Sequence, residues 1–180
     1  MNTIQAIKTR KSPERFNDEP LTRDDITAIA EAGAYAPIFG KVHFTVVDDK
    51  DLIAKIDEAG LAGMRASGND FAMKLANIPG YSAVRNAAAF VIISSKGGMQ
   101  EMGFGMANVA CAAENICLAA TDRGIGSRFM MGPVGALAEP SIAERLAIPE
   151  GYEPLVMVAL GHTDDQPTER DREVKNLTFA

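Results

Sequence analysis

Stretches of apolar residues along the chain predict a small number of strands and helices. Two of them, AAAFVIISS at 87–95 and PLVMVAL at 154–160, are continuous apolar runs of the kind found in strands that are buried on both faces. The segment HFTVVD at 43–48 is rich in residues that favour strands and predicts a third. Helical spacing or capping signals predict helices over residues 2–9, from Thr22 to near Pro37, over 51–59 and over 139–147. Together these elements indicate an α+β fold with a small mixed sheet flanked by helices.

The dominant element is an apolar helix predicted over residues 102–123. Its sequence, MGFGMANVACAAENICLAATDR, is apolar on all sides and is interrupted mainly by Asn108, Glu114 and Asn115. A helix of this kind has to be buried all round. In a chain of 180 residues, a subunit interface is the simplest way to bury it.

Glycines are expected to end two of the helices, one at Gly60 and the long one at Gly124 with Gly126. Residues 61–85 form the least regular part of the sequence, yet they contain large apolar side chains. This combination predicts a packed lid or binding loop rather than a linker. No internal repeat and no domain boundary is visible, so we expect a single domain over residues 1–180.

The composition limits the classes of function. Acidic residues outnumber basic ones by 24 to 18, and the formal charge of −6 argues against a general nucleic-acid binder, which needs a basic face. No run reaches the ~18 apolar residues of a membrane span, and the first residues lack the apolar core of a signal peptide. Cys111 and Cys117 have no metal-ligand spacing and are expected to be reduced. We therefore expect a cytoplasmic protein with no metal site and with neither nucleic acid nor membrane as a partner.

Two basic clusters are candidates for binding an anion. Arg10-Lys11-Ser12 combines two cations and a hydroxyl at the point where the first helix should break, so its side chains and free backbone N–H groups could hold a phosphate. Arg170 and Arg172 occupy alternate positions of an extended segment and could direct both guanidiniums at one anion. Taken singly, each cluster is more typical of a solvated surface segment.

The sequence lacks the common catalytic motifs. His43 and His162 stand at strand ends without a carboxylate at ligand spacing, which favours structural roles. Neither Gly103-Phe104-Gly105 nor Gly124-Ile125-Gly126 completes the dinucleotide-binding pattern GxGxxG. There is no nucleophile elbow, P-loop or HExxH, so acyl transfer, phosphoryl transfer and metalloprotease chemistry have no support.

Four segments, spread over nearly the whole chain, carry a resemblance to a known family. Arg10-Lys11-Ser12 with Phe16 is similar to the motif RRSxRxF, and Ala36-Pro37 followed by HFTVVD is similar to APSxxNxQPWxFxVV. The helix ANVACAAENICLAATDRGIGS resembles a long central helix closed by GLGS, and GHTDDQPTERDR resembles a closing strand with its tail. In this order they resemble the nitroreductase family of FMN-dependent NAD(P)H oxidoreductases, which implies an intertwined α+β homodimer.

The resemblance implies an FMN cofactor held by residues from both ends of the chain. Those expected around its phosphate and ribityl chain are Arg10, Lys11, Ser12, Arg170 and Arg172. The backbone N–H of Met131 or Gly132 would face flavin N5. Pro37 and Ile38 would contact the flavin bound mainly to the other subunit.

Two departures from the family pattern fall at the isoalloxazine end. Glu14 occupies a position where the family has a Lys or Arg beside flavin N1/O2, and the cation is displaced to Arg15. A carboxylate ~4 Å from the anionic reduced flavin would oppose it by about 4 kcal/mol at an effective dielectric of ~20. Either Pro13 shifts the register so that Arg15 takes the role, or the reduced state is disfavoured. The segment after Ala36-Pro37 is shorter than the family pattern and lacks its Asn and QPW, so no amide partner for the flavin edge is evident.

The leading interpretation is an enzyme that transfers hydride from NADH or NADPH through flavin N5 to a nitroaromatic, quinone or enone in a ping-pong scheme. Such chemistry belongs to the cofactor, which explains why no catalytic side chain stands out. A second interpretation is a degenerate member that binds FMN or another phosphate ligand without efficient turnover, and a third is a helical dimer without cofactor. Acceptor choice is expected to depend on residues 61–85 and on the region near Phe39.

Overall fold

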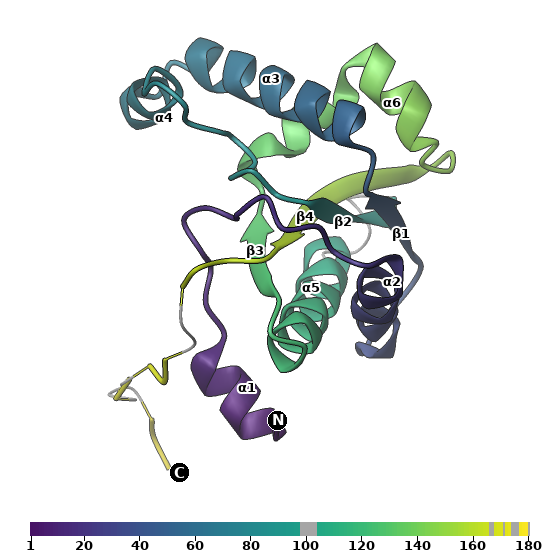
Figure 1. Cartoon of the computed structure of the whole chain (residues 1–180). Coiled ribbons are helices and arrows are strands. Elements are labelled where there is room, and N and C mark those ends of the chain that lie inside the picture. Colours follow the sequence, from purple (N-terminus) through teal and green to yellow (C-terminus); the bar gives the residue numbers. More distant parts are fainter. Residues whose placement is uncertain (98–103, 166–167, 171, 174–176, 180) are drawn as a thin grey trace.

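The structure, a computed structural model, describes residues 1–97, 104–165, 168–170, 172–173 and 177–179. Most of its helices and strands coincide with those that the sequence predicts (Figure 1). In chain order the elements are α1 (Thr3–Thr9), α2 (Arg23–Ala32), η1 (Gly33–Tyr35), β1 (Val42–Val47), α3 (Lys50–Ala66), α4 (Asp70–Ala76), β2 (Ala89–Lys96), α5 (Phe104–Asp122), β3 (Gly126–Met130), η3 (Gly132–Ala138), α6 (Pro140–Leu146) and β4 (Tyr152–Gly161).

The four strands form one sheet in the order β1-β2-β4-β3. The α+β class is confirmed, but the expected mixed sheet is wrong, because all three strand pairs are antiparallel. The excursion through α3 and α4 leaves and re-enters the sheet at the same end, where Val47 pairs with Phe90. Strand β2 therefore runs back alongside β1 rather than parallel to it.

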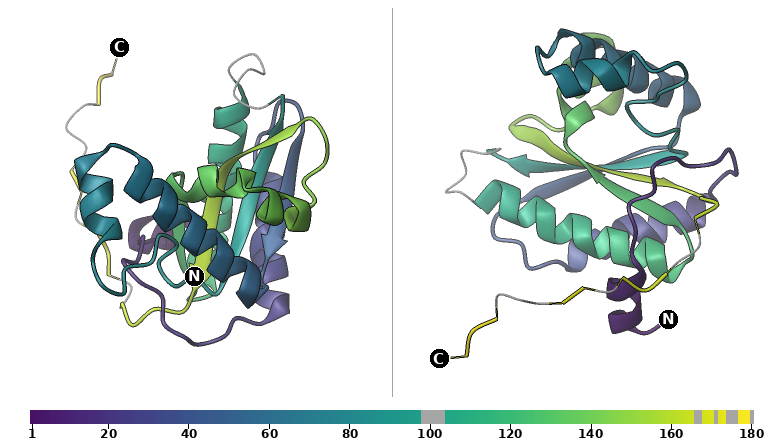
Figure 2. Two further views of the ribbon diagram at one scale, coloured as in Figure 1. Left: turned by 90° about the horizontal axis from the view of Figure 1, so that it is seen from above. Right: turned by 90° about the vertical axis from the view of Figure 1, so that its left-hand side faces the viewer.

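Helices cover both faces of the sheet (Figure 2). Val91 and Ile93 of β2 belong to a core shared with α2 and α5, whereas Phe90 and Ile92 belong to a core shared with α3 and α6. Successive residues of a strand point to opposite faces, so both sets are buried. This double burial is the physical reason for the continuous apolar run that predicts β2.

The long apolar helix is confirmed as α5, although residues 102–103 of the prediction lie outside the described part of the chain. Val109 and Ile116 are fully buried against the sheet. Phe104, Ala107 and Cys111, spaced at about one helical turn, remain exposed. In one chain, α5 thus exposes Phe104 and the small side chains of Ala107 and Cys111 to solvent, followed on the same face by Glu114.

Glycines end the helices less often than the sequence suggests. Helix α3 continues through Gly60 to Ala66, where the prediction stopped it at 59. A Cβ at Gly60 would lie 3.0 Å from the Cβ of Ala83, so this glycine allows close packing inside a helix. Gly124, with φ of +72°, does terminate α5, whereas Gly126 begins strand β3, which the sequence analysis does not anticipate.

Residues 61–85, expected to be irregular, contain the last turns of α3 and all of α4. Asn69 caps α4 by accepting a hydrogen bond from the N–H of Ala72 at 3.0 Å. The first part of the segment therefore lies over the sheet as two helices with a short connection, whereas residues 77–85 form neither helix nor strand, as expected (Figure 2). It forms one wall of the pocket described below.

Among the described residues, no helix is long and apolar enough to cross a membrane. In the same part of the chain, no group of three or more His, Cys, Asp or Glu side chains is arranged to hold a metal ion.

Candidate functional site

The two basic clusters that the sequence singles out lie together at helix α1. The backbone N–H of Arg170 donates to the carbonyl of Lys8 at 3.1 Å, and its guanidinium donates to the carbonyls of Ile7 at 2.8 Å and Lys8 at 3.3 Å. These carbonyls belong to the last turn of α1, where the helix itself offers them no donor. The C-terminal tail is thereby docked beside α1, directly before Arg10 (Figure 1).

The pKa of Arg170 reports the charges around it. Partial burial lowers this pKa, and the neighbouring charges of Arg10 and Arg172 lower it further, against an opposite effect from Glu114. Because a charge acts strongly only at short range, all three guanidiniums belong to one cluster. Three cations facing one carboxylate leave this cluster with a net positive charge.

Arg10 is largely enclosed, with a side chain that is 18% exposed. Its Nε lies 3.2 Å from Glu114 Oε1, and its Nη1 lies 3.5 Å from Ser12 Oγ. This Nε is paired in charge with Glu114, but its buried N–H makes no hydrogen bond of good geometry among the described residues. A buried donor without an acceptor costs about 1–3 kcal/mol, so an anion that supplied one would be favoured here. The donors present therefore fit a phosphate group.

Lys11 takes a different place from its neighbours. It lines a hollow of about 350 Å³ next to Pro13, Gly124 and Thr163, at the C-terminal end of α5. The structure thus gathers four of the five predicted phosphate residues, Arg10, Ser12, Arg170 and Arg172, and places Lys11 in an adjoining hollow.

Phe16 fixes the loop that follows the basic cluster. Its side chain is 1% exposed and covers Gly161 at the end of β4, where an added Cβ would lie 2.9 Å from the phenyl ring. Its N–H donates to the Arg85 carbonyl at 2.9 Å, and the N–H of Asn17 donates to the His162 carbonyl at 2.9 Å. The loop is therefore anchored to the sheet immediately before the tail begins.

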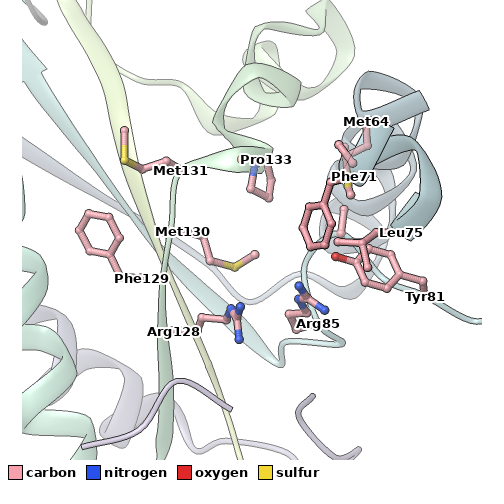
Figure 3. Close-up of a pocket in the computed structure, with 14 residues that line it drawn as sticks. Met64, Phe71, Leu75, Tyr81, Arg85, Arg128, Phe129, Met130, Met131 and Pro133 are labelled. Atoms are coloured by element: carbon pink, nitrogen blue, oxygen red, sulfur yellow. The ribbon is translucent and has the colours of Figure 1, made fainter. Parts of the chain in front are cut away.

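A pocket of about 320 Å³ lies between the end of β3 and the helices α3 and α4 (Figure 3). Met64 of α3 and Phe71 and Leu75 of α4 form one side. The opposite side runs from Arg128 to Pro133 and includes both residues predicted to face flavin N5, Met131 and Gly132. Met131 precedes η3 and Gly132 begins it. The Gly132 N–H has no partner within the helix, whereas Pro133 has no N–H and the Val134 N–H donates to the Met131 carbonyl at 3.1 Å. A Cβ at Gly132 would meet nothing within 4 Å, so the backbone there is open to a ligand.

Glu14 pairs with two arginines that line this pocket. Its carboxylate oxygens lie 3.7 Å from Arg85 Nη1 and 3.5 Å from Arg128 Nη1. The Glu14 side chain is 82% exposed, whereas those of Arg85 and Arg128 are 18% and 21% exposed. The carboxylate that the sequence analysis expects to oppose a reduced flavin is thus accompanied by two cations.

Arg15, the displaced cation of the family motif, is engaged elsewhere. With the Asn86 amide turned so that its oxygen faces Arg15, this oxygen accepts from Nη2 at 2.9 Å and from Nε at 3.0 Å. Arg15 is not among the residues that line the pocket of Met131 and Gly132, within the part of the chain that the structure describes. The cations nearest to Glu14 are Arg85 and Arg128, which the sequence analysis does not single out.

Pro37 and Ile38 belong to a loop near the N-terminal end of α5. Pro37 is exposed and Ile38 is half-buried against the core of α5. The loop is held by Asn108, whose Oδ1 accepts from the Phe39 N–H at 2.9 Å and whose amide donates to the Phe39 carbonyl. Arg10 meets α5 at Glu114, about 9 Å further along the helix. The predicted contact of Pro37 and Ile38 with a partner's flavin remains a prediction.

Comparison with known proteins gives a consistent result. The model of the nitroreductase family matches residues 7–162. A protein of Archaeoglobus fulgidus, provisionally named NADH dehydrogenase/NAD(P)H nitroreductase, is 27% identical over 91% of this chain and 86% of its own length. The FMN-bound nitroreductase structure from Bacteroides fragilis is 26% identical, covers 100% of this chain and 99% of its own, and superposes with a TM-score of 0.85. An FMN-bound nitroreductase from Desulfitobacterium hafniense, 24% identical with coverages of 100% and 99%, shares the fold at a TM-score of 0.87.

Proposed function

The chain belongs to the nitroreductase family of flavin oxidoreductases, and on this premise we propose that it transfers hydride from NADH or NADPH, by way of FMN, to a small electrophilic acceptor. Nitroaromatics, quinones and enones are the acceptor classes. The two half-reactions share one pocket, so the kinetics are ping-pong. The observation that carries this proposal is the cluster of Arg10, Arg170 and Arg172, which brings both ends of the chain together beside a buried Arg10 Nε–H that makes no hydrogen bond among the described residues.

The phosphate of FMN would bind at this cluster. Arg10 and Arg172 supply charge, the Ser12 hydroxyl supplies a further polar contact, and Arg170 holds the tail in place through the carbonyls of α1. Charge-assisted hydrogen bonds to a phosphate are the strongest that these side chains can make. Lys11, in its adjoining hollow, would add to the positive potential.

The ring system of FMN would lie along the backbone at Met131 and Gly132, where the Gly132 N–H at the start of η3 is open to a ligand. When bound, FMN supplies the hydride-accepting and hydride-donating chemistry that no side chain of the chain offers. The apolar side chains of α3 and α4 would line the pocket beside it. The protein would thus position the cofactor, place an apolar pocket beside its ring and supply positive charge at its phosphate.

We further propose a homodimer formed through the exposed face of α5. Phe104 presents a large apolar side chain on this face, and the small side chains of Ala107 and Cys111 beside it would let two helices approach closely. Phe39, 68% exposed, packs against Phe104 with 5.7 Å between ring centroids and extends this surface. A second copy would bring Pro37 and Ile38 to the flavin of its partner.

Steady-state kinetics under anaerobic conditions test the proposed reaction. NADH and NADPH oxidation is followed with 4-nitrobenzoate and a simple quinone as acceptors, with both substrates varied. We expect turnover dependent on bound FMN and parallel double-reciprocal lines, the pattern of a ping-pong scheme. Arg145 belongs to α6 and is remote from the candidate site, so the variant Arg145→Ala is expected to have unchanged rates.

The alternative is a family member that binds FMN without efficient turnover. It is favoured by Glu14, which stands where the family places a cation, and by the shortened segment after Pro37. A protein that retains FMN but oxidises neither NADH nor NADPH would support this alternative.

A further inference from the structure

Near the proposed flavin site, two arginines pair with one carboxylate in the described part of the chain, so their positive charge exceeds the negative charge beside them. Arg85 and Arg128 share the carboxylate of Glu14 at 3.7 and 3.5 Å. Both distances exceed the 2.7–2.9 Å, roughly, of a charge-assisted hydrogen bond. The carboxylate is largely in water, while the two guanidiniums are mostly buried. Two cations and one anion leave a net positive charge at this end of the pocket.

Both guanidiniums are held in position by other contacts. Arg128 Nη1 donates to the carbonyl of Pro13 at 2.9 Å, and the guanidinium carbon of Arg85 lies 4.7 Å above the centre of the Tyr81 ring. The backbone of Arg85 has φ of +63°, a conformation that few residues other than glycine adopt. Such a conformation persists where surrounding contacts enforce it. Figure 3 shows the two side chains at the same end of the pocket.

The rest of the pocket is apolar and partly aromatic. Phe71, Leu75 and Met64 line one side, and Met130 and Pro133 line the other. Its volume of about 320 Å³ suits a small ligand. An apolar cavity with cations at one end is complementary to a ring that carries a negative charge.

We propose that Arg85 and Arg128 recognise the anionic group of the acceptor, and that the preferred acceptors are aromatic carboxylates. Their ring would occupy the apolar cavity beside Met131 and Gly132, and their carboxylate would bind between the two guanidiniums in competition with Glu14. This assignment rests on the proposed function, because it places the acceptor beside the flavin. Beyond the proposed function, it means that the enzyme selects its acceptor by negative charge as well as by reducible group.

Binding of redox-inert ligands tests the assignment without any turnover. Isothermal titration calorimetry measures the affinity of the oxidised, FMN-loaded protein for benzoate and for its neutral analogue benzamide. We expect benzoate to bind at least about tenfold more tightly, as charge-assisted hydrogen bonds imply. This comparison uses the unmodified protein and does not depend on the folding of any variant.

Two variants then test whether Arg85 and Arg128 cause the preference for benzoate. Arg85→Met and Arg128→Met are each expected to abolish the preference for benzoate and to change the affinity for benzamide by less than about twofold. Arg145→Met, an arginine of α6 that pairs with Asp49 at 3.0 Å, is the control and keeps the preference. Equal affinities of the unmodified protein for benzoate and benzamide would overturn the proposal.

Flavin content, measured on the same samples, separates this inference from the proposed function. Variants that lose FMN but keep the preference for benzoate would show that the arginines serve the cofactor, and the proposal would be wrong. A protein that contains FMN and is reduced by NADH, yet does not distinguish benzoate from benzamide, would overturn this inference alone. A preference for benzoate without reduction by either nicotinamide would instead overturn the proposed function.

Discussion

The guanidinium of Arg170 donates to the carbonyl of Ile7 at 2.8 Å, which joins residues 163 positions apart. This bond holds the C-terminal tail so that the positive charge of Arg172 lies in the same cluster as that of Arg10. Two of the five guanidinium N–H donors of Arg170, one on Nε and one on Nη2, bind carbonyls of α1, so we assign to Arg170 the role of positioning the tail. The two side chains that we expect to carry the phosphate charge are therefore Arg10 and Arg172.

Removing either of these charges should weaken FMN binding. Arg10→Ala and Arg172→Ala are each expected to raise the dissociation constant of FMN by about 10–100-fold, since each removes a charge-assisted hydrogen bond worth about 1.5–3 kcal/mol. The quenching of flavin fluorescence on binding gives the constant directly. The control Arg145→Ala should leave it unchanged, and unchanged binding in Arg10→Ala would refute the phosphate assignment.

Neutralising Glu14 should raise the midpoint potential of the bound flavin. Glu14→Gln removes a negative charge near the site where the reduced cofactor carries its own, and Glu14→Lys adds a positive one. We expect shifts on the order of tens of millivolts for the first and larger ones for the second, because Arg85 and Arg128 already offset part of the charge. Potentiometric titration measures both. A potential lowered by Glu14→Gln would contradict this electrostatic role.

A charge placed on the exposed face of α5 should break the homodimer. Ala107→Arg introduces a guanidinium into the apolar surface proposed as the interface, where it would be desolvated without a partner. We expect a monomer by light scattering at micromolar concentration and reduced FMN retention. Ala62→Arg, at an exposed position of α3, is the matched control. A monomeric unmodified protein, or a dimeric Ala107→Arg, would place the interface elsewhere.

Cys117 should make folding stability fall at high pH. Burial raises the pKa of this thiol from 9.0 to about 11, against a weaker opposite effect of the Ser127 hydroxyl. The unfolded chain loses the proton near the ordinary pKa while the folded chain keeps it, so stability is lost as pH rises from about 9 to about 11. The loss amounts to about 2–3 kcal/mol.

Urea unfolding of the unmodified protein and of Cys117→Ala, at pH 7.5 and 10.5 on roughly either side of the ordinary thiol pKa, measures the contribution of this thiol to the free energy of unfolding. The variant lacks the thiol, so its stability should fall less between the two pH values. Equal losses in both proteins would show that Cys117 does not carry the effect.

The sequence predicts the parts of the fold that depend on local pattern. Strands β2 and β4 follow from continuous apolar runs, and α2 begins at Thr22, whose Oγ1 accepts from the Asp25 N–H at 3.1 Å as the capping pattern predicts. The path of α3 past Gly60 depends on the close approach of Ala83, a contact distant in sequence. Strand β3 is short, and no periodicity marks it. The antiparallel sheet depends on where the chain re-enters it, which composition does not reveal.

Part of the candidate site can likewise be predicted from the sequence, and part depends on tertiary contacts. Arg10, Ser12, Arg170 and Arg172 can be predicted, because paired cations are few in an acidic chain and stand at its two ends. Arg85 cannot, since its position depends on a left-handed backbone and on the Tyr81 ring. Arg128 is visible in the sequence, but its orientation depends on the Pro13 carbonyl across the sheet edge.

Anaerobic reduction of the bound flavin tests the central claim most directly. The purified protein, loaded with FMN, is titrated with NADH and separately with NADPH in the absence of oxygen and of any acceptor. We predict that at least one of them bleaches the visible flavin absorption with one equivalent per flavin, and that 4-nitrobenzoate then restores it. A yellow protein whose absorption neither nucleotide changes would contradict the account.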